Sequence, residues 1–263
     1  REELFPPMVE ALHKLGGIPI KPILAESMQM GDENHTRQTA CDYIYDRLML
    51  PALFELDRPK KEIMKTVRYI VDTPRFFHCY GQAAARAALV AADGTEYSTM
   101  VTAVCGNGVE FGIKIASLPG QWFTAPAPMM KGRYTSSEFT EKDQLPWMGD
   151  SCVVECYGMG GFAAAASPIV CNLRGMTLKE SIGQTKEMYR ITMEKNYNFP
   201  IPNLDFDFLP VGIDIRKVLK EGVCPAIHGG MFNRVGGLIG AGMARVPMQC
   251  FEKALVAFGE KYL

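Results

Sequence analysis

The sequence predicts an α+β fold: a helical N-terminal third, followed by a mixed, largely antiparallel β-containing domain with flanking helices. Apolar residues recur at helical spacing over residues 1–95, and two alternating apolar runs around an Asn-Gly pair predict a hairpin soon afterwards. The later elements lack the regular βαβ alternation of a doubly wound sheet. We therefore expect a helical subdomain over residues 1–95 and an α+β domain over residues 96–263.

The helical part is predicted from periodicity and from its stop signals. Leu4, Met8 and Leu12 share one face of a helix over residues 2–14, and Gly16-Gly17 ends it. Further helices are expected at about 37–55, 59–72 and 75–92, with Asp93-Gly94 closing the last one.

The β-containing part is predicted to begin at Ser98. Asn107-Gly108 is expected to form the hairpin turn, with positive φ at both residues. The rigid segment Trp122–Pro128 follows, and residues 129–148 have the composition of a long loop, suited to a lid or a binding site.

Several elements are predicted after residue 148. Thr177 and Glu180 form a capping-box pattern that opens a helix to about Lys195. Residues 198–210 are expected to be irregular and residues 208–246 to hold short strands, and a terminal helix is expected over 247–262.

Composition narrows the class of protein. The chain has 263 residues, of which 48% are hydrophobic and 22% charged, as is usual for a soluble globular enzyme. A net charge of −1 gives no electrostatic reason to expect nucleic acid or an acidic membrane as a partner. No apolar run reaches the ~18 residues that span a bilayer. Eight cysteines in apolar contexts, without a CxxC pair, indicate a reduced cytoplasmic protein and no metal site.

The run Gly31–Arg37 concentrates acidic, imidazole and guanidinium groups. It is either a helix start with a Glu33–Arg37 ion pair, or a site in which His35 carries protons and Arg37 clamps an anion. Metal binding by Asp32, Glu33 and His35 is a third alternative.

Two glycine-rich segments allow structural and functional interpretations. Residues 158–163 match a GxGxxA dinucleotide fingerprint after Val153-Val154, but Pro168 leaves little room for the crossover helix. Two roles are therefore left for the glycines of these segments: they allow tight packing, or their backbone N–H groups hold an anion. The glycines concerned are Gly160, Gly161 and, in the run 236–242, Gly240.

Two further polar groups are ambiguous. Ser151 follows Asp150 and resembles a nucleophile, but no histidine is adjacent in the sequence, so a helix cap is the favoured interpretation. Asp214 and Arg216 lie two apart in a segment expected to be extended, as a surface ion pair or a substrate clamp.

The chain resembles the AllG-type subunits of oxamate carbamoyltransferase. The resemblance rests on motifs in the same order along nearly the whole chain: residues 30–37, 98–128, 149–155, 158–163, 202–205, 211–218, 239–242 and 247–255. Two positions depart from the family pattern, which usually has Arg where this chain has Gly106 and an Asn-Thr-Gly-like triplet at His228-Gly229-Gly230. Members usually carry a further segment before the point where this chain starts, so we expect a fragment of a longer protein.

The resemblance implies a subunit of a carbamoyltransferase complex in allantoin and purine catabolism. The reaction would be oxalurate + phosphate → carbamoyl phosphate + oxamate, with small anionic substrates, partner subunits and no cofactor; a homo-oligomer stays open. The alternative is a non-catalytic interaction subunit whose partner chains hold the active site.

Residue roles are expected from the resemblance together with the chemistry of each side chain. Proton transfer is assigned to His35, Glu110 and Glu33. Substrate binding is assigned to Arg37, Asn107, Asp150, Ser151, Glu155, Asp214, Arg216, Gly160, Gly161 and Gly240. We expect at least two of the stretches around residues 33–37, 107–110 and 150–155 to line one pocket, with Trp122–Pro128 as a wall.

Overall fold

The structure is a computed structural model that describes residues 2–263. Its N-terminal part is helical, as predicted. The helices are α1 (Phe5–Lys14), α2 (Ile20–Gln29), α3 (Thr39–Phe54), α4 (Lys60–Val71) and α5 (His78–Val90). Helix α2 is not among the predicted elements, although Ile23, Leu24 and Met28 have helical spacing and are buried. None of the helices over residues 2–263 is long and apolar enough to cross a membrane.

The β-rich part contains three antiparallel sheets, which confirms the α+β class. The strands are β1 (Val101–Asn107), β2 (Glu110–Ile115), β3 (Phe123–Pro126), β4 (Lys131–Tyr134), β5 (Met148–Gly149), β6 (Thr192–Ile201), β7 (Asp207–Ile213), β8 (Ala226–Phe232) and β9 (Leu238–Arg245). The sheet orders are β3-β2-β1-β5, β4-β9-β8 and β6-β7.

Further helices flank these sheets. They are α6 (Val153–Cys156), α7 (Pro168–Leu173), α8 (Leu178–Tyr189), α9 (Ile215–Glu221) and α10 (Met248–Tyr262), with 3-10 turns η1 (Gly160–Ala166) and η2 (Pro202–Leu204). The capping box at Thr177 and Glu180 is confirmed. The helix ends at Tyr189 rather than Lys195, because the chain then enters β6 and pairs with β7 where an irregular segment was expected.

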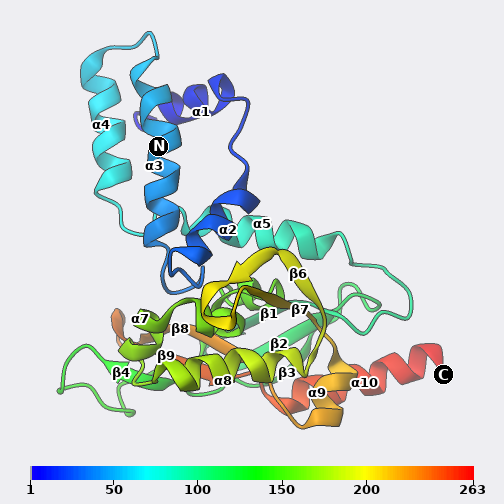
Figure 1. The fold of residues 1–263 in the computed structure, drawn as a ribbon. Coiled ribbons are helices and arrows are strands. Elements are labelled where there is room, and N and C mark those ends of the chain that lie inside the picture. Colours follow the sequence, from blue (N-terminus) through cyan, green and yellow to red (C-terminus); the bar gives the residue numbers. More distant parts are fainter. Residues whose placement is uncertain (1) are drawn as a thin grey trace.

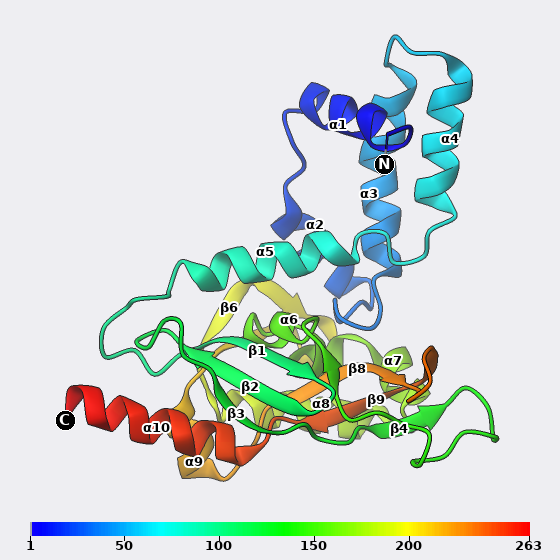
Figure 2. The same ribbon diagram turned by 180° about the vertical axis from the view of Figure 1, so that it is seen from behind.

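The helices α1, α3 and α4 project from the β-rich body, whereas α5 lies along it (Figure 1). Seen from behind, α5 lies on one side of the β1–β2–β3 sheet and α10 on the other (Figure 2). The α2–α3 connection reaches the body, where the carbonyl of Glu33 accepts a hydrogen bond from the backbone N–H of Gly160 at 2.6 Å. This contact brings residues 30–38 to the site described below.

The predicted hairpin forms, but its turn lies one residue later than expected. Gly108 has φ 86°, whereas Asn107 and Val109 do not have positive φ. Asn107 Oδ1 accepts the backbone N–H groups of Val109 and Glu110 at 2.9 and 2.7 Å. Gly108 and Val109 are thus the central residues, and a glycine at the first of them is typical of a type II′ turn.

Candidate functional site

The loop between α2 and α3 is held rigidly by Asn34. This residue has φ 62°, and its side chain is buried. Its Nδ2 donates to the carbonyl of Leu24 at 3.0 Å, and its Oδ1 accepts from Ser27 Oγ at 3.0 Å. The loop therefore presents its neighbours Glu33 and His35 to the body of the protein in fixed positions.

No helix begins within Gly31–Arg37, contrary to one interpretation of that run. Asp32 instead caps α3 from outside, since its Oδ2 accepts the N–H groups of Ala40 and Cys41 at 2.8 and 3.0 Å. Its Oδ1 lies 3.1 Å from Arg37 Nε. Burial raises the pKa of Asp32 to about 6, despite these N–H groups and the guanidinium.

The expected Glu33–Arg37 side-chain ion pair is wrong. Glu33 Oε1 accepts the backbone N–H of Arg37 at 2.8 Å and that of Thr36, while the guanidinium turns to Asp32. Arg37 therefore neutralises a protein carboxylate.

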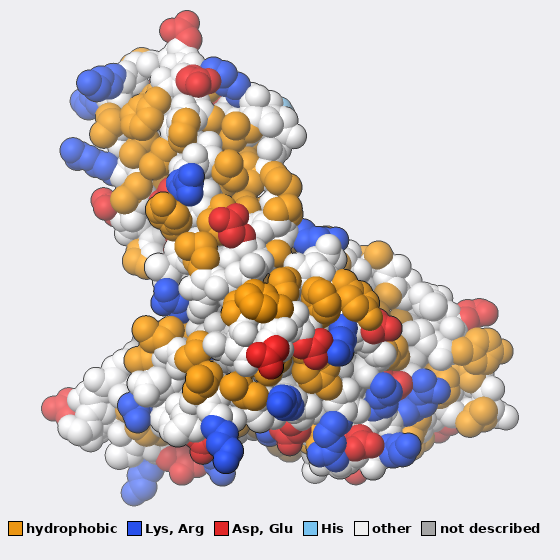
Figure 3. Space-filling model, viewed as in Figure 1, with side chains coloured by type: hydrophobic (Ala, Val, Ile, Leu, Met, Phe, Trp, Pro, Cys, Tyr) orange, Lys and Arg blue, Asp and Glu red, His pale blue; other side chains and the backbone are white. Residues whose placement is uncertain are grey.

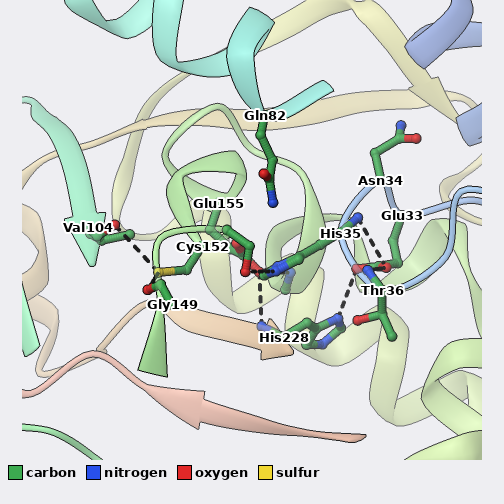
Figure 4. A network of polar contacts seen from close by, with 12 residues as sticks. Glu33, Asn34, His35, Thr36, Gln82, Val104, Gly149, Cys152, Glu155 and His228 are labelled. Atoms are coloured by element: carbon green, nitrogen blue, oxygen red, sulfur yellow. Dashed lines mark hydrogen bonds and ion pairs between the residues drawn. The ribbon is translucent and has the colours of Figure 1, made fainter. Parts of the chain in front are cut away.

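A hydrogen-bonded chain joins Ser151, His35 and Glu155. Ser151 Oγ lies 2.9 Å from His35 Nε2, and His35 Nδ1 lies 2.8 Å from Glu155 Oε1. His35 is 2% exposed and Glu155 is fully buried, whereas Ser151 is half-buried. Figure 4 shows the imidazole of His35 between the loop at Glu33 and the carboxylate of Glu155.

The position of α6 explains why Ser151 and Glu155 both contact the imidazole of His35. Ser151 and Glu155 are four residues apart across its start, so their side chains lie on the same side. Helix α6 has no side-chain cap, so the prediction that Ser151 caps a helix is wrong. The Val153-Val154 pair lies in α6 rather than in a strand, which removes the strand that a dinucleotide fingerprint requires.

One oxygen of the Glu155 carboxylate accepts three hydrogen bonds. Its Oε1 accepts from His35 Nδ1 and from the backbone N–H groups of Gly161 at 3.0 Å and His228 at 2.9 Å. Burial raises the pKa of Glu155, while His35 and these N–H groups oppose that shift. A Cβ at Gly160, where φ is 60°, would collide with the Glu155 carboxyl. Gly160 and Gly161 thus accommodate a protein carboxylate.

A second buried pair joins Glu33 to His228. Glu33 Oε2 lies 3.2 Å from His228 Nδ1, and Gln184 Nε2 lies 2.9 Å from His228 Nε2. Because Gln184 Nε2 also donates to the carbonyl of Gly161 at 2.7 Å, it faces His228 as a donor. A proton on Nδ1 would donate to Glu33 and leave Nε2 to accept from Gln184. Arg174 Nη1, however, lies 2.6 Å from the same Nδ1 and needs a lone pair there, so no single neutral tautomer serves all three contacts.

The guanidinium of Arg174 supplies positive charge beside this pair. Arg174 lies against His228, with Nη1 2.6 Å from Nδ1, and donates through Nη2 to Thr36 Oγ1. Burial and the charge of Arg174 lower the pKa of His228 to about 3, so its imidazole is neutral. Burial opposes ionisation of Glu33, but the bond to His228 and the Arg174 charge hold its pKa well below the usual range.

A cavity of about 380 Å³ opens beside Ser151 and His35. It is also lined by Arg75, His78, Trp147 and Gly240. Burial, together with Arg75 and His35, lowers the pKa of His78 to about 3, so His78 is neutral. The guanidinium of Arg75 therefore supplies positive charge to the cavity lining. Arg75, His78 and Trp147 were missed by sequence reasoning. His78 is one of only four histidines, which was the available signal.

The stretches at 33–37 and 150–155 meet here, as expected, but the hairpin residues lie elsewhere. Asn107 and Glu110 line a different cavity of about 290 Å³ with Trp122, so Trp122 is not a wall of the first cavity. Glu110 Oε1 accepts from Thr124 Oγ1 at 3.1 Å. Asp150 lines a third cavity, of about 450 Å³.

Asp214 and Arg216 do not face these groups. Asp214 has extended backbone angles and is the N-cap of α9, whereas Arg216 lies inside that helix; Asp214 Oδ1 accepts the N–H of Arg216 at 2.9 Å. Arg216 Nη2 lies 3.1 Å from Asp214 Oδ2. They are thus paired with each other. Within residues 2–263, no three His, Cys, Asp or Glu side chains form a group that could hold a metal ion.

Gly106 and His228, where the resemblance predicts other residues, have local structural roles. A Cβ at Gly106 would lie 2.6 Å from Trp147 Cδ1, so glycine lets Trp147 pack at the cavity. His228 bonds Glu33 through its ring and Glu155 through its backbone, and so links the two buried carboxylates.

These features define an α+β protein with a buried carboxylate–imidazole–hydroxyl chain at a cavity that holds a guanidinium. Residues 1–151 match the family model described as oxamate carbamoyltransferase subunit AllG, and the chain belongs to this family. It is 36% identical to uncharacterized protein YahG and 34% identical to oxamate carbamoyltransferase subunit AllG, both of Escherichia coli K12. These alignments cover 100% and 99% of this chain, but 56% and 63% of those proteins.

A solved structure has the same fold. It is the crystal structure of a conserved protein of unknown function from Enterococcus faecalis V583, with a TM-score of 0.93 and 36% identity. The match covers 97% of this chain and 62% of that one. The chain thus spans less than two thirds of the length of each of these relatives.

Proposed function

We propose that this chain contributes the proton-transfer and anion-binding groups of a carbamoyltransferase, acting with partner subunits on oxamate and carbamoyl phosphate or on oxalurate and phosphate. The observation that carries the proposal is the chain from Ser151 through His35 to Glu155, which opens onto a cavity lined by Arg75. Membership of the AllG family supports the substrate class.

Carbamoyl transfer to oxamate requires removal of a proton from the attacking nitrogen. The neutral imidazole of His35 can accept it, because the Glu155 carboxylate stabilises the imidazolium that forms. The substrates are carboxylates and phosphates, which a guanidinium binds well. Glu33 is buried and bonded to His228, and Glu110 borders another cavity, so His35 is the proton carrier of the proposal.

The test is oxamate-dependent release of phosphate from carbamoyl phosphate by the protein purified with its partner subunits. We expect turnover with both substrates and a loss of at least ~10²-fold in H35Q. Co-purification of the partners must be unchanged in this variant. Absence of turnover in the wild-type complex, or full activity in H35Q, would contradict the proposal.

A non-catalytic interaction subunit is the second candidate, favoured by the apolar surface of the projecting helices. Large apolar side chains are exposed there, and Figure 3 shows them gathered over that part of the molecule. They include Phe54, Val71, Tyr43 and Val9, which are 60%, 55%, 54% and 49% exposed. This candidate predicts that changes on these helices abolish assembly, whereas H35Q has no effect on turnover.

A further inference from the structure

Ser151 ends the buried hydrogen-bonded chain on the side of the cavity. Its Oγ lies 2.9 Å from His35 Nε2 and borders the cavity of about 380 Å³. Of Ser151, His35 and Glu155, the serine is the most exposed. A small molecule in the cavity would therefore meet the hydroxyl.

The hydrogen bond to Glu155 fixes the direction of the serine proton. His35 Nδ1 donates to the Glu155 carboxylate, so the neutral ring keeps a lone pair on Nε2. The Ser151 hydroxyl then donates to that lone pair. A hydroxyl bonded in this way to an oriented imidazole meets the geometric requirement for an activated nucleophile.

A purely structural use of Ser151 is poorly supported. The segment gives α6 no side-chain cap, and the hydrogen bond that Ser151 Oγ makes within residues 2–263 goes to His35. A serine that only oriented the ring would not need access to a cavity.

We propose that Ser151 is a covalent nucleophile that carries the carbamoyl group as an ester between two half-reactions; this inference rests on the proposed function. Oγ bonds to the carbamoyl carbon of oxalurate while its proton passes to His35 Nε2. The bond from that carbon to the oxamate nitrogen then breaks. This nitrogen takes the proton from His35, and oxamate leaves.

The second half-reaction restores the serine. A phosphate oxygen bonds to the carbonyl carbon of the ester, and the bond from that carbon to Oγ breaks. The proton of the phosphate passes through His35 to Oγ, which gives carbamoyl phosphate and a free hydroxyl. The two half-reactions add up to the proposed transfer without an oxidant or other co-reactant.

Isotope exchange tests this proposal on the complex with its partner subunits. Isotopically labelled oxamate is incubated with unlabelled oxalurate in the absence of phosphate. A serine ester regenerates oxalurate from labelled oxamate, so we expect exchange in the wild type and in S136A, whose serine does not line the cavity, and none in S151A. Direct transfer to phosphate gives no isotope exchange when phosphate is left out. If a complex that catalyses the full reaction shows no exchange, the proposal is overturned.

Labelling gives an independent readout that needs no partner. The purified chain is treated with 4-nitrophenyl dimethylcarbamate, and the adduct is mapped by mass spectrometry. We expect one dimethylcarbamoyl group on Ser151, slower labelling in H35Q and none at this position in S151A. No adduct, or one mapped to another residue, counts against the nucleophile.

The two proposals can fail separately. If S151A keeps full carbamoyl transfer, the nucleophile is wrong while the proposed function stands. If Ser151 is labelled but the complex transfers no carbamoyl group, the nucleophile is supported and the proposed function falls.

Discussion

His35 and Glu155 are hydrogen-bonded across 2.8 Å in a place where both side chains are shielded from solvent. An ion pair gains strength in such surroundings because water does not screen it. The carboxylate can therefore stabilise a positive charge that develops on the imidazole during proton transfer. Glu155 acts through His35 and is a positioning residue.

The first prediction concerns E155Q, which keeps the shape of the side chain but removes its charge. We expect kcat to fall by ~10²-fold or more with little change in KM. E155D, which keeps the charge, should recover part of the lost kcat. Equal loss of kcat in both variants would indicate a structural role alone.

The second prediction concerns Arg75, whose guanidinium lines the cavity. Its Nη2 donates to the carbonyl of His35 at 3.0 Å, so it is held at the site. R75Q should raise KM for the anionic substrates by roughly 10-fold to 100-fold, as expected for loss of a hydrogen bond to a charged group. R75K should recover part of the loss, and R68Q, on the exposed face of α4, should have no effect. A change confined to kcat would argue against anion binding.

Local signals in the sequence predicted much of the fold. The capping box at Thr177 and the hairpin around Gly108 depend on residues a few positions apart, and both form. The end of α8 was predicted too late, because pairing of β6 with β7 involves residues that the local pattern does not connect.

The candidate site shows the same limit more clearly. His35 and Ser151 are 116 positions apart, and no spacing rule joins them. From the sequence, a helix cap is favoured over a nucleophile for Ser151, because no histidine stands near it. The acidic and glycine-rich motifs indicated residues 33–37 and 150–161. The pairing of each carboxylate with its histidine, however, depends on how the α2–α3 loop packs against α6 and η1.

The third prediction concerns stability against pH. His78 and His228 have pKa values of about 3 in the folded protein, below the ~6.5 of an unfolded histidine. The unfolded chain then binds more protons, so stability is complete above pH ~6.5 and falls as the pH drops towards 3. Each histidine contributes up to ~1.4 kcal/mol per pH unit.

Asp32 and Glu155 act in the opposite direction over part of this range, because burial raises the pKa of each carboxyl. The pKa of Asp32 is about 6, above the unfolded value of ~3.9, so its protonation below pH 6 favours the folded state. Urea midpoints between pH 7 and 6 should fall for the wild type. H78Q and H228N should each flatten the decline, whereas H13Q, at an exposed position, should not. An unchanged slope in both variants would show that neither histidine titrates as inferred.

The last prediction compares two glycines with similar backbone angles. Gly160 has φ 60° and Gly222 has φ 65°, so alanine at either position costs about 1–2 kcal/mol for the left-handed conformation. A Cβ at Gly222 meets nothing within 4 Å, whereas at Gly160 it meets the carboxyl of Glu155 and the Cβ of His35.

G160A should therefore lower the free energy of unfolding by more than G222A, as measured by urea denaturation. It should also displace Glu155 from His35 and reduce carbamoyl transfer by the assembled complex, while G222A keeps full activity. Equal destabilisation of the two variants would mean that the site can absorb the extra methyl group. Full activity in G160A would show that turnover does not depend on the contact between Glu155 and His35.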